Sequence, residues 1–139
     1  MSIQDVIAQL GQGMLTSVLI YALTLIGAVP LALPLALARG GRSKIARLLT
    51  GAYISFMRGT PLMLQLIAVY FGPWYLFRIR ISDGYRFYAV IIAFVLNYAA
   101  YFAEIYRAGI AAVPKGQREA AAVLGYTNAQ AFFRIVLPQ

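Results

Sequence analysis

The chain has 139 residues, of which 62% are hydrophobic and only 12% charged, with a mean hydropathy of +0.75 and a net charge of +8. A soluble globular domain is about 45–50% apolar and about 25% charged, so this composition is typical of a membrane protein, and the short chain excludes a large multi-domain soluble enzyme. The absence of cysteine and histidine excludes disulfide frameworks, zinc fingers, haem and iron–sulfur ligation, and catalysis by histidine or cysteine. We therefore expect no catalytic residue, no metal site and no cofactor.

The first apolar segment is the longest. Residues 6–38 carry no charge, whereas a bilayer core requires only about 20 apolar residues. The flank before this segment lacks the basic start of a signal peptide, which indicates a retained span. We predict this first span over about 13–38, and residues 3–10 can form a short interfacial helix. Pro30 and Pro34 predict a kink within the span.

The second predicted span covers about 55–77. Residues 59–77 carry no charge and are numerous enough to cross a bilayer. Thr60 followed by Pro61 is typical of a helix start, with threonine as the N-cap and proline in the first turn. Residues 45–57 are mostly apolar, and they either begin this span or lie at the membrane interface.

The third predicted span covers about 87–110, and an amphipathic segment over about 111–138 follows it. Pro114 is expected to break the third helix. A short helix is predicted over 116–124, ending at Gly125 as a C-cap, and a further helical stretch over about 127–136. The sequence therefore predicts an all-α transmembrane fold with three membrane-spanning helices.

The positions of the basic residues predict which side of the membrane each loop occupies. Residues 39–47 and 107–134 each contain four Lys or Arg, the loop at 78–86 contains three, and the N-terminal flank contains none. Because basic loops stay in the cytoplasm, we expect 39–47 and 107–134 on the cytoplasmic side and the N-terminus and 78–86 outside. On this interpretation the excess positive charge lies beside the membrane. The lipid bilayer is therefore an expected partner, and nucleic acid is not.

Four polar or charged residues within or beside the spans are candidates for the substrate path: Gln65, Asn97, Glu104 and Arg58. Such side chains are costly in hydrocarbon, so they face a partner or a cavity. Gln65 and Asn97 can instead form hydrogen bonds between helices. Glu104 can pair with Arg107 one turn later, or with Arg58 across two helices.

The amphipathic segment carries the most informative motif. Residues 119–125 read Glu-Ala-Ala-Ala-Val-Leu-Gly, and residues 135–138 read Ile-Val-Leu-Pro. The order Glu-Ala-Ala, three residues, Gly, nine residues, Ile-x-Leu-Pro resembles the cytoplasmic coupling loop of bacterial ABC importer permeases. Residues 58–62 (Arg-Gly-Thr-Pro-Leu) and 103–110 resemble one group of that family, the permeases for histidine, glutamine, arginine, opines and other polar amino acids.

This resemblance implies a permease fold of roughly five helices, of which residues 1–139 supply three spans and the coupling-helix loop at about 111–138. On this comparison the chain is expected to be incomplete at its C-terminus. The residues that the resemblance assigns to coupling with an ATPase are Glu119, Ala120, Ala121, Gly125, Ile135, Leu137 and Pro138. The small side chains suit close helix docking, and glycine permits a sharp turn. Glu119 is expected to cap the short helix or pair with a basic residue.

The implied function is that of a permease subunit in the bacterial inner membrane, importing a polar amino acid by alternating access. The sequence has no phosphate-binding Gly-x-x-x-x-Gly-Lys-[Ser/Thr] motif, so ATP hydrolysis is assigned to cytoplasmic ABC ATPase subunits. A second permease copy or paralogue and an extracytoplasmic solute-binding protein complete the expected assembly. The alternatives are a permease for another small solute, or a truncated membrane protein without transport activity.

Overall fold

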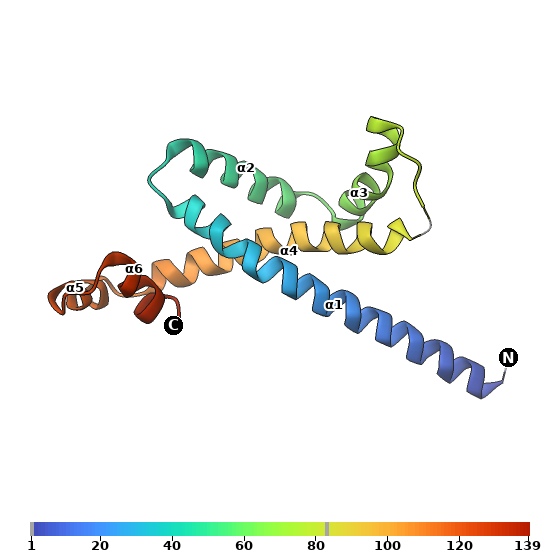
Figure 1. The fold of residues 1–139 in the computed structure, drawn as a ribbon, viewed down its shortest axis with the longest axis horizontal. Helices are drawn as coiled ribbons and strands as arrows, with labels where there is room; N and C mark the ends of the chain where they lie inside the picture. The colour runs from blue at the N-terminus through green and yellow to red at the C-terminus, as the bar shows by residue number, and fades with distance from the viewer. Residues whose placement is uncertain (1, 83) are drawn as a thin grey trace.

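The computed structural model describes residues 2–82 and 84–139, which fold almost entirely into helices and contain no strand (Figure 1). In chain order the elements are α1 (Ile3–Gly40), α2 (Lys44–Gly59), α3 (Leu62–Phe77), α4 (Tyr85–Ala112), α5 (Lys115–Val123), α6 (Asn128–Ala131) and the π-helical turn η1 (Phe132–Val136). Helices α1 and α4 are each long and apolar enough to cross a bilayer, and α2 with α3 adds a third crossing if the bent pair is one span. The predicted all-α transmembrane fold class is confirmed.

Helix α1 begins well before the predicted start of the first span. The Ser2 hydroxyl accepts a hydrogen bond from the Asp5 N–H, and the Asp5 carboxylate accepts one from the Ser2 N–H at 2.9 Å. This capping box starts the helix at once, so residues 3–10 belong to α1 instead of forming a separate interfacial helix. The helix also continues through Pro30 and Pro34 without a break.

The stretch predicted as the second span, 55–77, is divided between two helices. The axes of α2 and α3 are bent by 108°. Thr60 has extended backbone (φ −111°, ψ 142°), and its hydroxyl donates to the carbonyl of Phe56 at 2.8 Å, so it ends α2. The prediction that Thr60 caps the start of the next helix is therefore wrong, and Pro61 holds that position. Proline favours extended backbone at the residue before it, which accounts for the break.

Helix α4 matches its prediction closely. It covers Tyr85–Ala112, a little longer at both ends than the predicted 87–110. Val113 has extended backbone before Pro114, and the helix ends there as expected. Helix α5 begins directly after Pro114, so the segment that follows α4 consists of short helical pieces separated by turns.

The core lies where α1 packs against α4, and it is built from small side chains. The buried residues of α1 recur every four positions; they are Thr24, Ala28, Ala32 and Ala36. The buried residues of α4 are Ala89, Ala93, Asn97, Ala99, Ala100 and Ala103. A Cβ placed on Gly27 would lie 2.7 Å from Cγ2 of Val95, so there is no room here even for a methyl group. Small side chains allow helix backbones in a membrane to approach closely.

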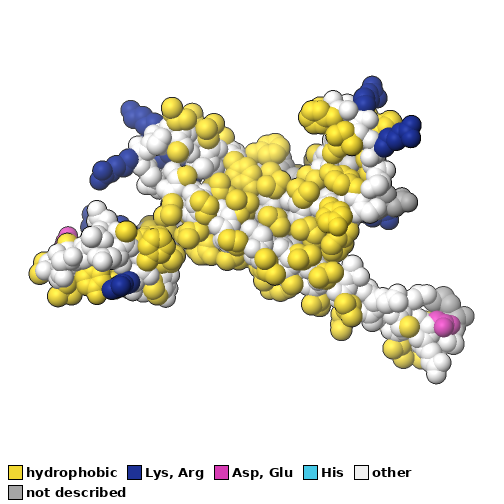
Figure 2. All heavy atoms as spheres, viewed as in Figure 1, with side chains coloured by type: hydrophobic (Ala, Val, Ile, Leu, Met, Phe, Trp, Pro, Cys, Tyr) yellow, Lys and Arg dark blue, Asp and Glu magenta, His cyan; other side chains and the backbone are white. Residues whose placement is uncertain are grey.

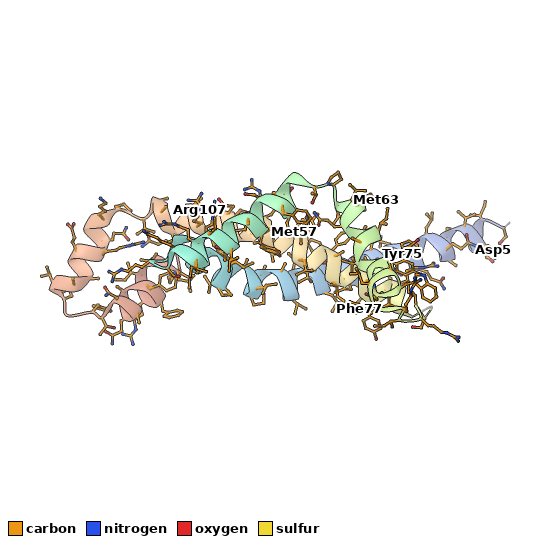
Figure 3. The ribbon with its side chains drawn as sticks, turned by 90° about the horizontal axis from the view of Figure 1, so that it is seen from above. Asp5, Met57, Met63, Tyr75, Phe77 and Arg107 are labelled. Carbon is orange, nitrogen blue, oxygen red and sulfur yellow. The ribbon has the colours of Figure 1, made fainter. Side chains whose placement is uncertain are left out.

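The two ends of the molecule carry different segments. In Figure 1 the turn between α1 and α2 lies toward the same end as α5 and α6, whereas the N-terminus and the segment after α3 lie toward the other end. Figure 3 places Arg107 near the first end and Asp5 at the second. In Figure 2 apolar side chains cover the middle of the visible face, and Lys and Arg side chains lie nearer its extremities. An apolar middle between charged ends suits a protein that crosses a bilayer.

Candidate functional site

Helix α5, the centre of the predicted coupling loop, is held by contacts on two sides. The Arg118 side chain donates from Nη2 to the carbonyl of Ile110 at 3.1 Å, near the end of α4. The last carbonyls of a helix have no partner within it, and basic side chains commonly satisfy them. The Gln139 amide donates to Oε1 of Gln117 at 2.6 Å, which holds the end of the described chain against α5. The segment is therefore a folded unit.

Gly125 forms the turn that follows the end of α5, as predicted. Its φ is +80°, in the left-handed region that favours glycine. The N–H of Gly125 donates to the carbonyl of Ala122, and the N–H of Tyr126 donates to the carbonyl of Ala121, both at 3.0 Å. This pair of bonds is a Schellman motif. In the described part of the chain, no atom beyond the adjacent residues lies within 4 Å of a Cβ built on Gly125, so the backbone conformation, and not crowding, calls for glycine.

The predicted coupling residues differ in their accessibility. Glu119 and Ala120 are exposed on α5, but Ala121 is only 1% exposed and packs inside the chain. Ala121 is therefore not free to contact a partner in this conformation. Val123 and Leu124 are 88% and 74% exposed, so they are the apolar side chains that this part of the segment presents.

The other predicted coupling residues lie around α5 and η1. Ile135 and Leu137 are half-buried and Pro138 is exposed. Helix α5 begins without a side-chain cap, and Glu119 forms no ion pair with any residue in 2–82 or 84–139. The expectation that Glu119 caps the helix or pairs with a basic residue is therefore wrong, because it lies in the middle of α5 with its side chain exposed.

Gln65 and Asn97, two of the predicted substrate-path residues, contact each other. The Asn97 amide donates from Nδ2 to Oε1 of Gln65 at 3.0 Å, and to the carbonyl of Met57 at 3.2 Å. The Gln65 amide donates from Nε2 to the carbonyl of Met57 at 2.9 Å and to Oγ1 of Thr60 at 2.8 Å. Both side chains are buried. They join α4 to the break between α2 and α3, which is the helix–helix contact that the sequence left as the alternative.

Glu104 forms the predicted ion pair with Arg107, at 2.8 Å, and a second one with Arg39 at the end of α1, at 3.6 Å. Arg58 takes no part in these pairs. Its guanidinium lies 5.4 Å from the centre of the Tyr101 ring, one turn before Glu104 on α4. The predicted pairing of Arg58 with Glu104 is therefore replaced by a cation–π contact, and arginines of α1 and α4 provide the two partners of the carboxylate.

Gly51 of α2 makes room for Arg39, which gives a first prediction. A Cβ on Gly51 would overlap the Arg39 guanidinium, so Gly51→Ala should displace this side chain from Glu104. The pair is partly exposed, and we expect the free energy of unfolding to fall by only about 0–1 kcal/mol. Thermal unfolding can be compared with that of Gly59→Ala, a position with open space around it. A loss of several kcal/mol would show that Gly51 has another role.

A cavity of about 410 Å³ lies beside the contact between α1 and α4. Its lining residues are Ser17, Ile20, Tyr21, Thr24, Leu25, Phe94, Tyr98 and Phe102. The hydroxyl of Thr24 is buried there without a hydrogen-bond partner in the described part of the chain. None of the predicted substrate-path residues lines this cavity.

Comparison with known proteins assigns the family. Residues 28–139 match the protein family described as the inner membrane component of binding-protein-dependent transport systems. The chain belongs to this family. The match begins within α1, covers the last third of that helix and everything after it, and includes the segment with the Glu-Ala-Ala motif. The predicted family is confirmed.

Curated members of the family similar to this chain are amino-acid permeases. The chain is 46% identical over 123 residues to the L-cystine transport system permease protein TcyL of Bacillus subtilis (strain 168), covering 86% of this chain and 52% of TcyL. It is 48% identical over 87 residues to the arginine transport system permease protein ArtQ of the same organism, covering 63% of this chain and 38% of ArtQ. It is 40% identical over 105 residues to the putative glutamine permease GlnP of Rickettsia prowazekii (strain Madrid E), covering 76% of this chain and 47% of GlnP.

A solved structure gives the same assignment. The crystal structure of an amino acid ABC transporter with histidines is 39% identical to this chain, with a TM-score of 0.74. The similarity covers 91% of this chain and 56% of that chain. The chain spans about half the length of the curated permeases that it matches.

Among the contacts between helices that sequence reasoning missed, three join α4 to α1, α2 or α3. The Tyr85 hydroxyl donates to the carbonyl of Val69 at 3.0 Å, the Tyr53 hydroxyl donates to the carbonyl of Leu96 at 2.6 Å, and Arg39 reaches Glu104. One of these had a signal in the sequence. Pro73 has no N–H, so the carbonyl four residues earlier loses its helical donor and needs another. The partners themselves are distant in sequence, and no local pattern identifies them.

Proposed function

We propose that this chain forms part of the permease subunit of an ATP-driven importer that moves a polar amino acid across the bacterial inner membrane. Similar permeases are named for cystine, arginine and glutamine, and a similar solved structure is an amino acid ABC transporter. The observation that carries the proposal is the form of residues 111–138. There a short helix with exposed apolar side chains, ended by a glycine turn, stands at one end of the helical body.

In the proposed mechanism a cytoplasmic ABC ATPase receives α5 in a groove. Exposed Val123 and Leu124 supply apolar contact, and exposed Glu119 is free to interact with the ATPase. ATP binding and hydrolysis then move this segment, and the permease changes between outward-open and inward-open states. A solute-binding protein delivers the amino acid from outside. A second permease copy or paralogue encloses the other half of the pathway.

The proposed orientation places α5 in the cytoplasm and the N-terminus outside. The chain has no native cysteine, so single cysteines can report on each side without background. Val123→Cys, at an 88% exposed position of α5, should react with a membrane-impermeant maleimide in inside-out vesicles but not in right-side-out vesicles. Ile3→Cys, exposed at the start of α1, should show the opposite pattern. Labelling of Val123→Cys from outside would contradict the orientation and the proposed ATPase contact.

The transport proposal is tested by uptake. Cells that carry the protein should accumulate at least one of labelled cystine, arginine, glutamine or histidine in an ATP-dependent manner, and cells without it should not. Val123→Asp tests whether uptake depends on the proposed docking surface. It places a charge on that surface, and it should abolish uptake while the protein still inserts into the membrane. Accumulation of a different solute class would support the same fold with another substrate. Equal uptake with and without the protein would contradict the proposal.

A further inference from the structure

The bend between α2 and α3 leaves a main-chain carbonyl without its usual donor. In a continuous helix the N–H of residue 61 would donate to the carbonyl of Met57, but Pro61 has no N–H. In a bilayer an unsatisfied carbonyl is costly, because there is no water to replace the missing donor. Here the Met57 carbonyl accepts two side-chain hydrogen bonds, at 2.9 Å from Nε2 of Gln65 and at 3.2 Å from Nδ2 of Asn97.

The two amides are fully used within the chain as donors. Besides Met57, the Gln65 amide donates to the carbonyl and the hydroxyl of Thr60, at 3.2 and 2.8 Å. The Asn97 amide donates to Oε1 of Gln65 at 3.0 Å. A primary amide has only two N–H bonds, so neither side chain has a donor left over for a ligand. Gln65 and Asn97 are 7% and 5% exposed, and neither lines the cavity beside α1.

A second proline in the same pair of helices shows the same arrangement. Pro73 removes the donor for the carbonyl of Val69, and the hydroxyl of Tyr85 donates to that carbonyl at 3.0 Å. Tyr85 and Asn97 of α4 thus each donate to a carbonyl freed by a proline. The Tyr53 hydroxyl adds a contact from α2 to the carbonyl of Leu96, next to Asn97. Helix α4 therefore supports the bent pair on both sides of the break.

We propose that Gln65 and Asn97 are positioning residues that hold α3 at its angle to α2, and that their amide N–H groups do not donate to substrate. The proposal rests on the proposed transport function in one respect only. If the protein is a permease, the bend between α2 and α3 shapes the wall of the transport pathway. The bend itself can be measured whether or not the protein transports an amino acid.

The test is a distance measurement between spin labels by pulsed electron paramagnetic resonance, on the full chain in lipid nanodiscs. Leu48→Cys on α2 and Leu76→Cys on α3 are exposed positions for the labels. At 1.5 Å per residue, a 108° bend places the two backbones about 25 Å apart, whereas a straight helix would place them about 42 Å apart. We expect a narrow distribution near the shorter value in the otherwise unsubstituted protein.

Removing the amides should release the bend. Gln65→Leu and Asn97→Leu should each broaden the distribution and shift it toward the longer distance. Pro61→Ala combined with Gln65→Leu should shift it furthest, because the restored N–H lets the helix continue through the break. The matched control is Gln12→Leu, the same change at an exposed position of α1, which should leave the distance unchanged.

A narrow, unshifted distribution in folded Gln65→Leu would overturn the proposal, and so would loss of amino-acid binding without any change in distance. If the leucine variants do not fold, Gln65→Met replaces them, because methionine has nearly the length of glutamine and no N–H to donate. An unshifted distance in that variant would equally overturn the proposal. Absence of uptake by the unsubstituted protein would contradict the transport function, whereas the distances would still decide the role of the amides.

Discussion

Gly125→Val should lower ATP-dependent uptake severalfold while the protein still inserts into the membrane. Gly125 has φ +80°, and the left-handed region costs an L residue roughly 1–2 kcal/mol, with a β-branched side chain at the unfavourable end. Such a free energy lowers the population of the native turn relative to other backbone conformations by about 5–30-fold. The Schellman bonds that orient α5 relative to α6 depend on that turn. The expected consequence is a misplaced α5 that a partner ATPase engages poorly.

The matched control is Gly116→Val, which makes the same change earlier in α5. Gly116 has helical backbone and open space around it, so valine there relieves the low helix propensity of glycine without strain. Uptake and ATPase stimulation should be measured for both variants in the same membranes, after their amounts are matched. Normal uptake by Gly125→Val would contradict the proposed role of the turn. Equal loss in both variants would point to a general effect of bulk on α5.

Ala32→Leu should destabilise the whole helical body. Ala32 is completely buried where α1 packs against α4, in a cluster with Ile54 and with Ala100 and Ala103 of α4. Three additional carbon atoms cannot be placed there unless the helices separate, and overpacking of this kind costs typically about 1–3 kcal/mol. The close approach that small side chains permit would also be lost along the length of the contact. Thermal unfolding in nanodiscs should show a clearly lowered midpoint.

Ala8→Leu provides the control for this substitution. It lies on the same helix, but its side chain is exposed, so the added leucine can enter the surrounding lipid or solvent. Its unfolding midpoint should stay close to that of the unsubstituted protein. If Ala32→Leu behaved like Ala8→Leu, the packing of α1 against α4 would not be the main source of stability.

Much of the chain could be predicted because the signals are local. Pro114 fixes the end of α4, and Gly125 fixes the turn after α5, through backbone restrictions that the sequence states directly. Glu104 and Arg107 are one helical turn apart, so their ion pair follows from the helix itself. The family could be identified for a similar reason, since the motif in 119–138 depends on residue types and spacing.

The bend between α2 and α3 could not be predicted, because Thr60 and Pro61 give the same local signal for a new helix as for a sharp break. The direction of α3 depends on Asn97, which lies 32 positions beyond Gln65 in the sequence. The same limit applies to Ala121, which is buried although its neighbours Ala120 and Ala122 on α5 are exposed. Contacts of this kind arise from tertiary packing, and neither periodicity nor composition describes them.

The hydrogen bond from Arg118 to the carbonyl of Ile110 has a mechanical consequence. It spans the proline break and fastens the short helix to a rod about 42 Å long, because α4 has 28 residues that rise 1.5 Å each. Asn97 lies on the same rod, so a force applied to the short helix would be transmitted along a rigid axis to the amides at the bend. The short helix and the bend between α2 and α3 would then be connected through one rigid helix, by the Arg118 side chain at one point and by Asn97 at the other.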